Sequence, residues 1–186
     1  MGSSASSADE WIELYNTGET TQDLSQWTLT RLTDEGEQVM LVIESGQINP
    51  GETFLIANYS SDHKNTRLES LPQLVNAALS LPNSKLQLRL YTGQPDTGAI
   101  LIDIADDGSG IPLAGDSEQK RSMVRIQFHG DGTKAESWAT AEKASGWDIE
   151  SIEMGTPGSI PQQSLSSETS SSTAVQVESW ATIKQP

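Results

Sequence analysis

Short extended runs separated by turn residues are the feature of this chain that most restricts its fold. The run "LQLRLY" (86–91) shows the pattern clearly, because Leu86, Leu88 and Leu90 fall on one face of a strand and polar or aromatic residues fall on the other. No run has the length and the 3.6-residue period of a long amphipathic helix. A series of short strands joined by turns predicts an all-β sandwich or barrel.

The remaining runs predict further strands and one short helix. The run at 39–44, "VMLVIE", is apolar on both faces, which predicts a central strand of a sheet. "LPQLVNAALSLP" predicts a short helix near residues 72–79. "GQPDTG", between the runs at 86–91 and 99–105, has the length of a hairpin connection. Strands are expected at 10–16, 26–32, 39–44, 53–58, 86–91, 99–105 and 121–128.

Composition divides the chain into four parts. Only 34% of the 186 residues are hydrophobic, so part of the chain is expected to lie outside the core. We predict a flexible N-terminus at residues 1–8 and a β-sandwich at 9–158. A Ser/Thr-rich linker at 159–173 lacks the apolar residues needed to order itself. Residues 174–186 are predicted to form a C-terminal β-segment, because the apolar residues in it alternate.

Charge and cysteine content exclude several classes of function. The chain has 26 acidic and 11 basic residues, a formal net charge of −15. Such a surface repels phosphate backbones and anionic membranes, so no nucleic-acid partner is expected, and a cationic partner or divalent cations are favoured. The absence of cysteine removes disulfides, thiolate metal sites and cysteine nucleophiles. No apolar run reaches the ~18 residues of a membrane span, so no membrane insertion is expected, and no signal peptide is recognisable.

The candidate catalytic residues do not form an arrangement known to support catalysis. Glu10 and Glu13 are three apart in a strand and therefore face opposite sides, so they cannot act as a paired acid and base. We expect a strand with one buried face and these carboxylates in solvent. His63 lies in a polar loop and His129 in a turn, with no zinc-ligand spacing. A Ser/His/Asp triad stays open, since its members need only meet in space, but no nucleophile-elbow, P-loop or dinucleotide motif is present. We predict a protein that is not an enzyme and has no cofactor.

The acidic loop at 103–116, "DIADDGSGIPLAGD", is the best metal candidate in the sequence. Asp106, Asp107 and Asp116 could offer oxygen ligands to calcium. The spacing does not match an EF-hand loop, and Asp and Gly also favour turns for conformational reasons alone. Calcium binding and a purely structural turn are therefore both open at this loop.

Residues 9–30, "DEWIELYNTGETTQDLSQWTLT", resemble the signature of the lamin tail domain, an immunoglobulin-like β-sandwich of two mainly antiparallel sheets. In that signature a strand E-W-[IV]-E-L-Y-N is followed by a turn and D-L-S-G-W-x-L, and here Gln26 replaces the glycine. Trp27 is expected to pack in the core between the sheets. The matching residues are Glu10–Asn16, Asp23, Leu24, Ser25, Trp27 and Leu29, followed by Ile48, Pro50, Gly51 and Glu52 of an I-x-P-G-E motif.

Motifs in the second half are similar to those of bacterial members of this family and extend the resemblance to about residue 160. Val124 replaces an acidic residue of that pattern. Arg125 stands at the arginine position of the family, where it is expected to pair with a carboxylate or a carbonyl inside the fold. The motifs are "PLAGD" (112–116), "RSMVR" (121–125), "DGT" (131–133), "SWATA" (137–141) and "GTPGS" (155–159).

The resemblance implies a non-catalytic interaction or attachment module of an exported or cell-surface bacterial protein, which binds another protein or a cell-surface polymer. The alternative is a calcium-dependent carbohydrate-binding module, which needs exposed aromatic residues. Trp11, Trp138 and Trp147 are better candidates for exposure than Trp27, although burial is the more common state of tryptophan. Animal lamin tails are associated with DNA and chromatin, but this acidic chain lacks the basic surface for that role.

In bacterial members an apolar strand precedes the signature, and this chain begins just after the place where that strand would end. Loss of the strand would leave unpaired N–H and C=O groups along a sheet edge. We expect the alternating segment 174–183 to fill the position, either in its own molecule or in a neighbour as a strand-exchanged homodimer.

Overall fold

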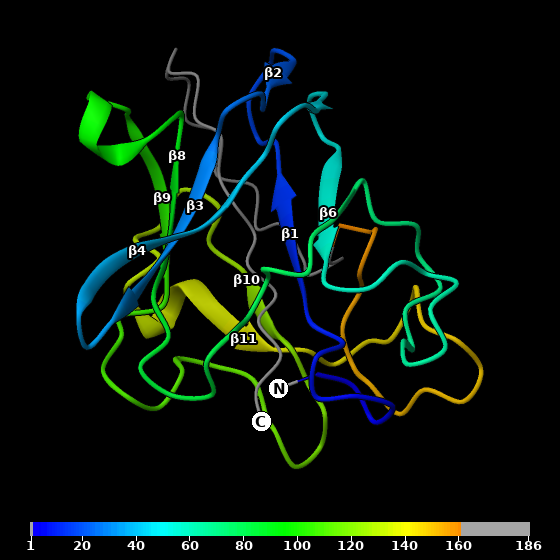
Figure 1. Ribbon diagram of the computed structural model, residues 1–186. Coiled ribbons are helices and arrows are strands. Elements are labelled where there is room, and N and C mark those ends of the chain that lie inside the picture. Colours follow the sequence, from blue (N-terminus) through cyan, green and yellow to red (C-terminus); the bar gives the residue numbers. More distant parts are fainter. Residues whose placement is uncertain (1, 161–186) are drawn as a thin grey trace.

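The computed structural model describes residues 2–160. This part of the chain is built from short strands and two single-turn 3-10 helices, with no α-helix (Figure 1). The elements are β1 (Trp11–Tyr15), β2 (Gln22–Asp23), β3 (Thr28–Thr33), β4 (Gly36–Val42), β5 (Gln47–Ile48), β6 (Thr53–Ala57), β7 (Leu74–Val75), β8 (Leu88–Tyr91), η1 (Pro95–Thr97), β9 (Leu101–Ala105), β10 (Met123–Arg125), η2 (Ala135–Ser137) and β11 (Trp138–Thr140). The prediction of an all-β, immunoglobulin-like sandwich is confirmed.

One layer of the sandwich is a four-stranded antiparallel sheet in the order β4-β3-β8-β9. The leucines at 86, 88 and 90 are buried as predicted, and Arg89 is partly exposed. Gln87 and Tyr91, which were expected on the outward face, are buried. The β8–β9 hairpin closes through η1, where Pro95 opens the turn and Gly98 ends it at a φ of 84°. A positive φ is easily reached only by glycine, which explains the residue at this position.

The second layer is a three-stranded sheet in the order β1-β6-β7. Strands β1 and β6 are antiparallel and pair from Trp11–Ala57 to Tyr15–Thr53. The short β7 joins β6 in parallel. Within the described residues β1 therefore forms one edge of this sheet.

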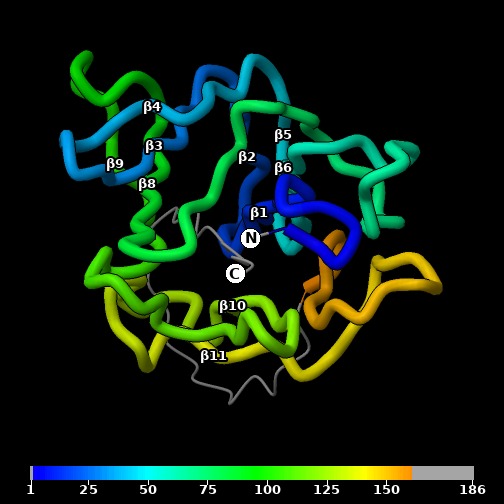
Figure 2. The backbone as a smooth tube through the Cα atoms, turned by 60° about the horizontal axis from the view of Figure 1, so that its bottom comes forward, coloured from blue at the N-terminus to red at the C-terminus, as the bar shows by residue number. Residues whose placement is uncertain are grey.

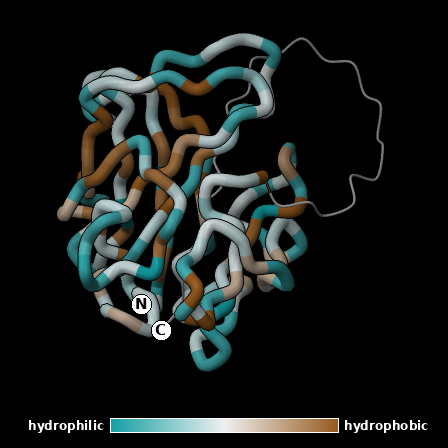
Figure 3. Tube along the Cα trace, turned by 90° about the vertical axis from the view of Figure 1, so that its right-hand side faces the viewer, coloured by the Kyte–Doolittle hydropathy of each residue, from teal (hydrophilic) through white to brown (hydrophobic). Residues whose placement is uncertain are grey.

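The core fills the space between the two sheets. Trp27 is 6% exposed and belongs to this cluster, so the prediction of a core tryptophan is confirmed. Its backbone is placed by Gln26, which has a φ of 67° and stands where the family pattern has glycine. Figure 3 shows hydrophobic positions recurring along the strands. Other members of the cluster are Ile12, Leu14, Leu29, Leu41, Ile43, Phe54, Ile56, Leu88, Leu90, Met123 and Trp138.

A third group of segments covers the face of β1 that points away from this core. Trp11 packs edge to face against Trp147, with ring centroids 5.9 Å apart. Leu55, Ala57 and Leu68 complete the cluster. Figure 2 shows the β10–β11 hairpin beside β1, and the chain continues from it toward residue 160. Both faces of β1 are therefore buried.

Two local predictions were wrong. The run at 39–44 was predicted to be central, but β4 lies at the edge of its sheet, with Val39 exposed and Met40 and Leu41 buried. Residues 72–79 contain β7 and turns in place of the predicted helix. Pairing of Leu74 with Ile56 on β6 provides a tertiary partner that the local pattern could not indicate.

Residues 2–8, which composition predicts to be flexible, pack against distant parts of the chain. Ser3 is buried, and the backbone N–H of Ser4 donates to the carboxylate of Glu153. The N–H of Gly2 donates to the Ser7 carbonyl at 2.8 Å, which closes the segment on itself. Most of the linker at 159–173 and the whole segment 174–186 lie outside the described residues.

We expect Trp27→Ala to lower the free energy of unfolding by roughly 3–5 kcal/mol, because a large aromatic side chain leaves a cavity between the sheets. Val39→Ala, at an exposed position on β4, is the control and should change it little. Urea denaturation followed by circular dichroism measures both. Equal losses in the two variants would contradict the placement of Trp27 in the core.

Candidate interaction surface

The aspartate side chains of the acidic loop at 103–116 accept hydrogen bonds from backbone N–H groups of the protein. Asp106 is 1% exposed and has a φ of 71°. Its Oδ1 accepts from the backbone N–H groups of Asp107 at 2.8 Å and Gly108 at 3.2 Å, and its Oδ2 accepts from Leu113 at 2.9 Å. Burial raises the pKa of the Asp106 carboxyl, and the three backbone donors partly offset that rise. This residue holds the loop closed.

The structure does not gather the calcium candidates into one site. Asp107 accepts from the N–H of Ser109 at 2.7 Å, and Asp116 accepts from that of Gln119 at 2.9 Å, so each closes its own turn. Within residues 2–160 no group of three or more histidine or acidic side chains is placed to hold a metal ion. The alternative interpretation, in which these aspartates form turns, accounts for all of these contacts.

Among residues 2–160 the histidines and tryptophans are not arranged for catalysis or for sugar stacking. His63 stacks on Tyr59 at 4.0 Å between ring centroids, and its Nδ1 accepts from the N–H of Asn65 at 3.2 Å. His129 lies on an exposed turn. The four tryptophans among residues 2–160 are all buried, so none of them offers an open aromatic platform.

The carboxylates of Glu10, just before β1, and of Glu13, within it, are buried, which corrects the prediction that they face solvent. Glu10 Oε2 accepts from the N–H of Leu81 at 3.0 Å. Glu13 is 1% exposed, and its Oε1 accepts from the N–H of Gly158 at 2.7 Å. Desolvation by burial raises the pKa of Glu13 to about 8, although hydrogen bonds from Thr53 and Gly158 oppose the rise. Alternation correctly placed these residues on opposite faces, but the segments that cover the second face come from far along the chain.

Arg125 is buried and paired, as predicted. Its Nε donates to the carbonyl of Gln127 at 2.8 Å, and its guanidinium lies 3.5 Å from the carboxylate of Asp103 on β9. The guanidinium also sits over the ring of Trp138, 4.9 Å from its centre. These contacts attach the β10–β11 hairpin to the edge of the four-stranded sheet.

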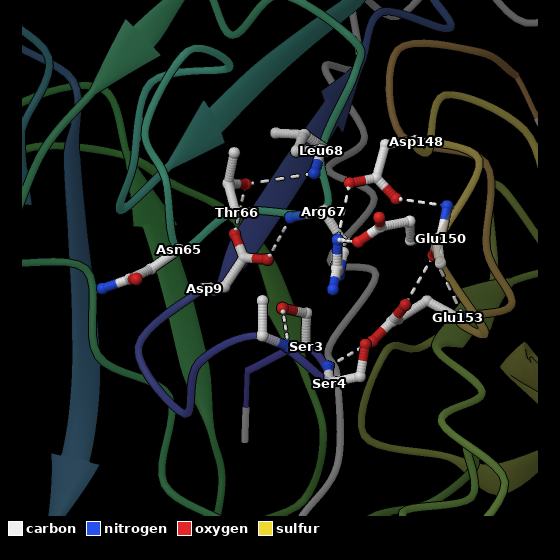
Figure 4. A network of polar contacts seen from close by, with 12 residues as sticks. Ser3, Ser4, Asp9, Asn65, Thr66, Arg67, Leu68, Asp148, Glu150 and Glu153 are labelled. Atoms are coloured by element: carbon white, nitrogen blue, oxygen red, sulfur yellow. Dashed lines mark hydrogen bonds and ion pairs between the residues drawn. The ribbon is translucent and has the colours of Figure 1, made fainter.

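A surface loop at residues 148–153 is anchored by ion pairs and hydrogen bonds (Figure 4). Arg67 Nη1 lies 3.1 Å from Asp148 Oδ2 and 2.7 Å from Glu150 Oε2. The N–H of Asp148 donates to the Arg67 carbonyl at 2.9 Å, and Asp148 Oδ1 accepts from the N–H of Glu150 at 3.0 Å. One arginine therefore fixes the first half of the loop through both its backbone and its side chain.

The second half of the loop is fixed by a buried carboxylate. Glu153 is 2% exposed, and its oxygens accept from the N–H of Ile152 at 3.0 Å and from the N–H of Ser4. The loop segment that carries Arg67 is held in turn by Asp9, which accepts from the Thr66 hydroxyl at 2.6 Å and from the Arg67 N–H at 2.8 Å (Figure 4). Residues from two distant parts of the chain, near positions 4–9 and 66–67, thus hold one loop.

This anchored loop presents two apolar side chains to solvent. Ile149 is 102% exposed relative to its reference and Ile152 is 64% exposed. Asp148 and Glu150 stand on either side of Ile149. We call residues 148–153 the isoleucine loop. Sequence reasoning missed this loop, because its only signal was two isoleucines in a polar, acidic segment.

Comparisons with known proteins identify the family. A family model for the Lamin Tail Domain matches residues 1–111, which includes β1 to β9. The isoleucine loop and the β10–β11 hairpin lie beyond the matched residues. No curated protein and no solved structure matches the chain.

We expect Glu13→Gln to stabilise the protein increasingly as the pH rises. Because the folded-state pKa of Glu13 is raised to about 8 from 4.5, the folded protein binds the proton more tightly than the unfolded chain does. The contribution of Glu13 is therefore fully present below pH 4.5 and is lost as the pH rises to about 8, by up to ~1.4 kcal/mol per pH unit. Glutamine keeps the acceptor for Gly158 and does not ionise.

Urea denaturation of the two proteins from pH 4 to pH 9 measures the difference. Glu19→Gln removes the same charge from an exposed turn and serves as the control. A stability difference between Glu13→Gln and the natural chain that does not vary with pH would contradict the burial of an ionisable Glu13.

We expect about 5 mM calcium, above the ~10⁻³ M dissociation constants of weak extracellular sites, to leave the melting temperature unchanged. The carboxylates of Asp106, Asp107 and Asp116 already accept backbone N–H donors and are not grouped. Differential scanning calorimetry with magnesium as the control makes the measurement. A calcium-specific rise that Asp106→Asn abolishes would show that the loop does bind the ion.

Proposed function

Because the chain belongs to the lamin tail domain family, a family of immunoglobulin-like interaction domains and not of enzymes, we propose that it is an attachment module of an exported or cell-surface bacterial protein. The isoleucine loop is the surface through which it binds. The partner is a protein, and the single observation that carries the proposal is an exposed isoleucine pair on a loop fixed by buried and ion-paired carboxylates.

Rigidity is what makes this loop suitable for binding. An exposed apolar side chain on a mobile loop loses conformational entropy when a partner orders it, and this loss weakens binding. Here Arg67 and Glu153 already hold the backbone around Ile149 and Ile152. A pre-ordered apolar anchor that fills a pocket on a partner is typical of the residues that dominate interface energy.

The charges around the anchor define the partner further. Asp148 and Glu150 flank Ile149 and share the single positive charge of Arg67, so this end of the loop keeps a net negative charge, and the whole chain carries a net charge of −15. A partner with an apolar pocket rimmed by lysine or arginine complements this arrangement, and a nucleic acid does not. In the described part of the chain, none of the helices is long or apolar enough to cross a membrane. Attachment to a cell surface through a protein partner is consistent with these features.

The test uses the full chain fused to a fluorescent protein and incubated with bacterial cell envelopes, half of them treated with protease. We expect saturable binding to untreated envelopes and its loss after treatment, because the partner is a protein. Ile149→Asp together with Ile152→Asp should weaken binding by roughly 30-fold, the effect of losing about 2 kcal/mol at an interface hot spot.

Ile111→Asp is the matched control, since Ile111 is 85% exposed on a different loop and receives the same charge. It should bind as the natural chain does. Undiminished binding of the double variant, with its fold intact by circular dichroism, would rule out the isoleucine loop as the binding surface. Binding that survives protease treatment would point to a polymer of the cell surface in place of a protein.

A further inference from the structure

Strand β1 is buried although it lies at the edge of its sheet. Among the described residues β1 pairs with β6 alone. Trp11 and Glu13 are each 1% exposed and Leu14 is fully buried. An edge strand is normally wetted by solvent along its free side or is covered by charged side chains. Neither holds for this edge.

Hydrogen bonds at the two ends of β1 show which backbone groups point toward the free side. The N–H of Asn58 donates to the Glu10 carbonyl at 2.9 Å, and the N–H of Asn16 donates to the Glu52 carbonyl at 3.1 Å. The backbone N–H and C=O groups of the even-numbered residues of β1 therefore pair with β6. In an antiparallel ladder the N–H and C=O groups of the odd-numbered residues point toward the opposite, free side of the strand. The N–H and C=O groups of Trp11 and Glu13 have no strand partner within residues 2–160. Buried backbone groups of this kind are paired in nearly all proteins.

The space next to this edge has a mainly apolar lining. A small cavity between the sheets is bordered by six apolar residues and one carboxylate: Ile12 and Leu14 of β1, Leu29 of β3, Leu88 and Leu90 of β8, and Asp103 and Ala105 of β9. No residue of β6 contributes to it, so the cavity lies toward the free side of β1. A strand added at this edge would place every second side chain over these residues.

The described chain ends beside the same strand. Gly158 donates its N–H to the Glu13 carboxylate at 2.7 Å, so the chain passes the middle of β1 two residues before position 160. The 15 residues from 159 to 173 can span up to about 50 Å. Five residues of β1 extend over roughly 17 Å. Whatever follows residue 173 can therefore lie along β1 in either direction.

We propose that residues 174–183 of the same chain add to the free edge of β1 as a strand. Within "AVQVESWATI", Val175, Val177, Ala181 and Ile183 share one face, with Ser179 between them, and they supply the apolar side that the cavity lining requires. The backbone of this segment pairs with the N–H and C=O groups of Trp11 and Glu13. By occupying the edge, the tail also protects it from pairing with another chain. The pairing is independent of what the isoleucine loop binds.

A spin label tests the pairing in the full chain. Because the chain has no cysteine, Glu178→Cys gives one labelling site, on the face of the segment that points away from the apolar side. Nuclear magnetic resonance of the labelled, isotope-enriched monomer should show the amide signals of Trp11 and Glu13 broadened beyond detection. The label at Ser109→Cys, on an exposed turn of another loop, should leave them visible. Sharp Trp11 and Glu13 signals with the label at position 178 would overturn the proposal.

Amide exchange and mixing complete the test. Val177→Asp, which puts a charge on the apolar face, should speed hydrogen exchange at Trp11 and Glu13 by about tenfold or more. Gln176→Asp places the same charge on the other face and should not. Equal exchange in both variants would count against the pairing.

A mixing experiment separates pairing within one chain from pairing between two copies. Chain that carries the spin label but no isotope is mixed with enriched chain that carries no label, and the Trp11 and Glu13 signals should not broaden. Broadening there would show a strand exchanged between two copies in place of the intramolecular tail.

Discussion

Burial of β1 on both faces holds the two halves of the described chain together. One face supplies Ile12 and Leu14 to the core between the sheets. The other face carries Trp11, which packs against Trp147 from the far end of the chain. A conventional half-buried strand would have left its second face to water, and Trp147 would have lost its partner on β1. The edge-to-face tryptophan pair and the apolar residues around it provide that contact.

The segments that cover the outer face of β1 also determine which residues lie at the nearby protein surface. Because the chain must return across Trp11 and Glu13, residues 147–158 are brought next to the segment around Arg67. The ion pairs of Arg67 then fix the start of the isoleucine loop, and burial of Glu153 fixes its end. A loop presenting apolar side chains is therefore anchored by hydrogen bonds and ion pairs that result from how the core is built. The exposure of the two isoleucines and the stability of the fold depend on the same packing.

The parts of the fold with strong local signals could be predicted from the sequence. Alternating leucines at 86–91 identified a strand, and the position of Trp27 in its motif indicated a core residue. Buried pairing of Arg125 was also expected. Predictions failed where a distant segment decided the outcome. The helix expected near 72–79 gave way to pairing with β6, and Glu13 became buried under residues that no local pattern connects to it.

Sequence alone determined the all-β class and the family, because strand periodicity and signature motifs are local properties of the chain. It also showed that the aspartates at 106, 107 and 116 fit turns as well as metal ligands. Only the tertiary structure decided which strand lies at an edge, which carboxylates are desolvated and which isoleucines remain exposed. Those properties depend on contacts between residues more than 50 positions apart, such as Glu13 with Gly158, and local periodicity carries no information about them.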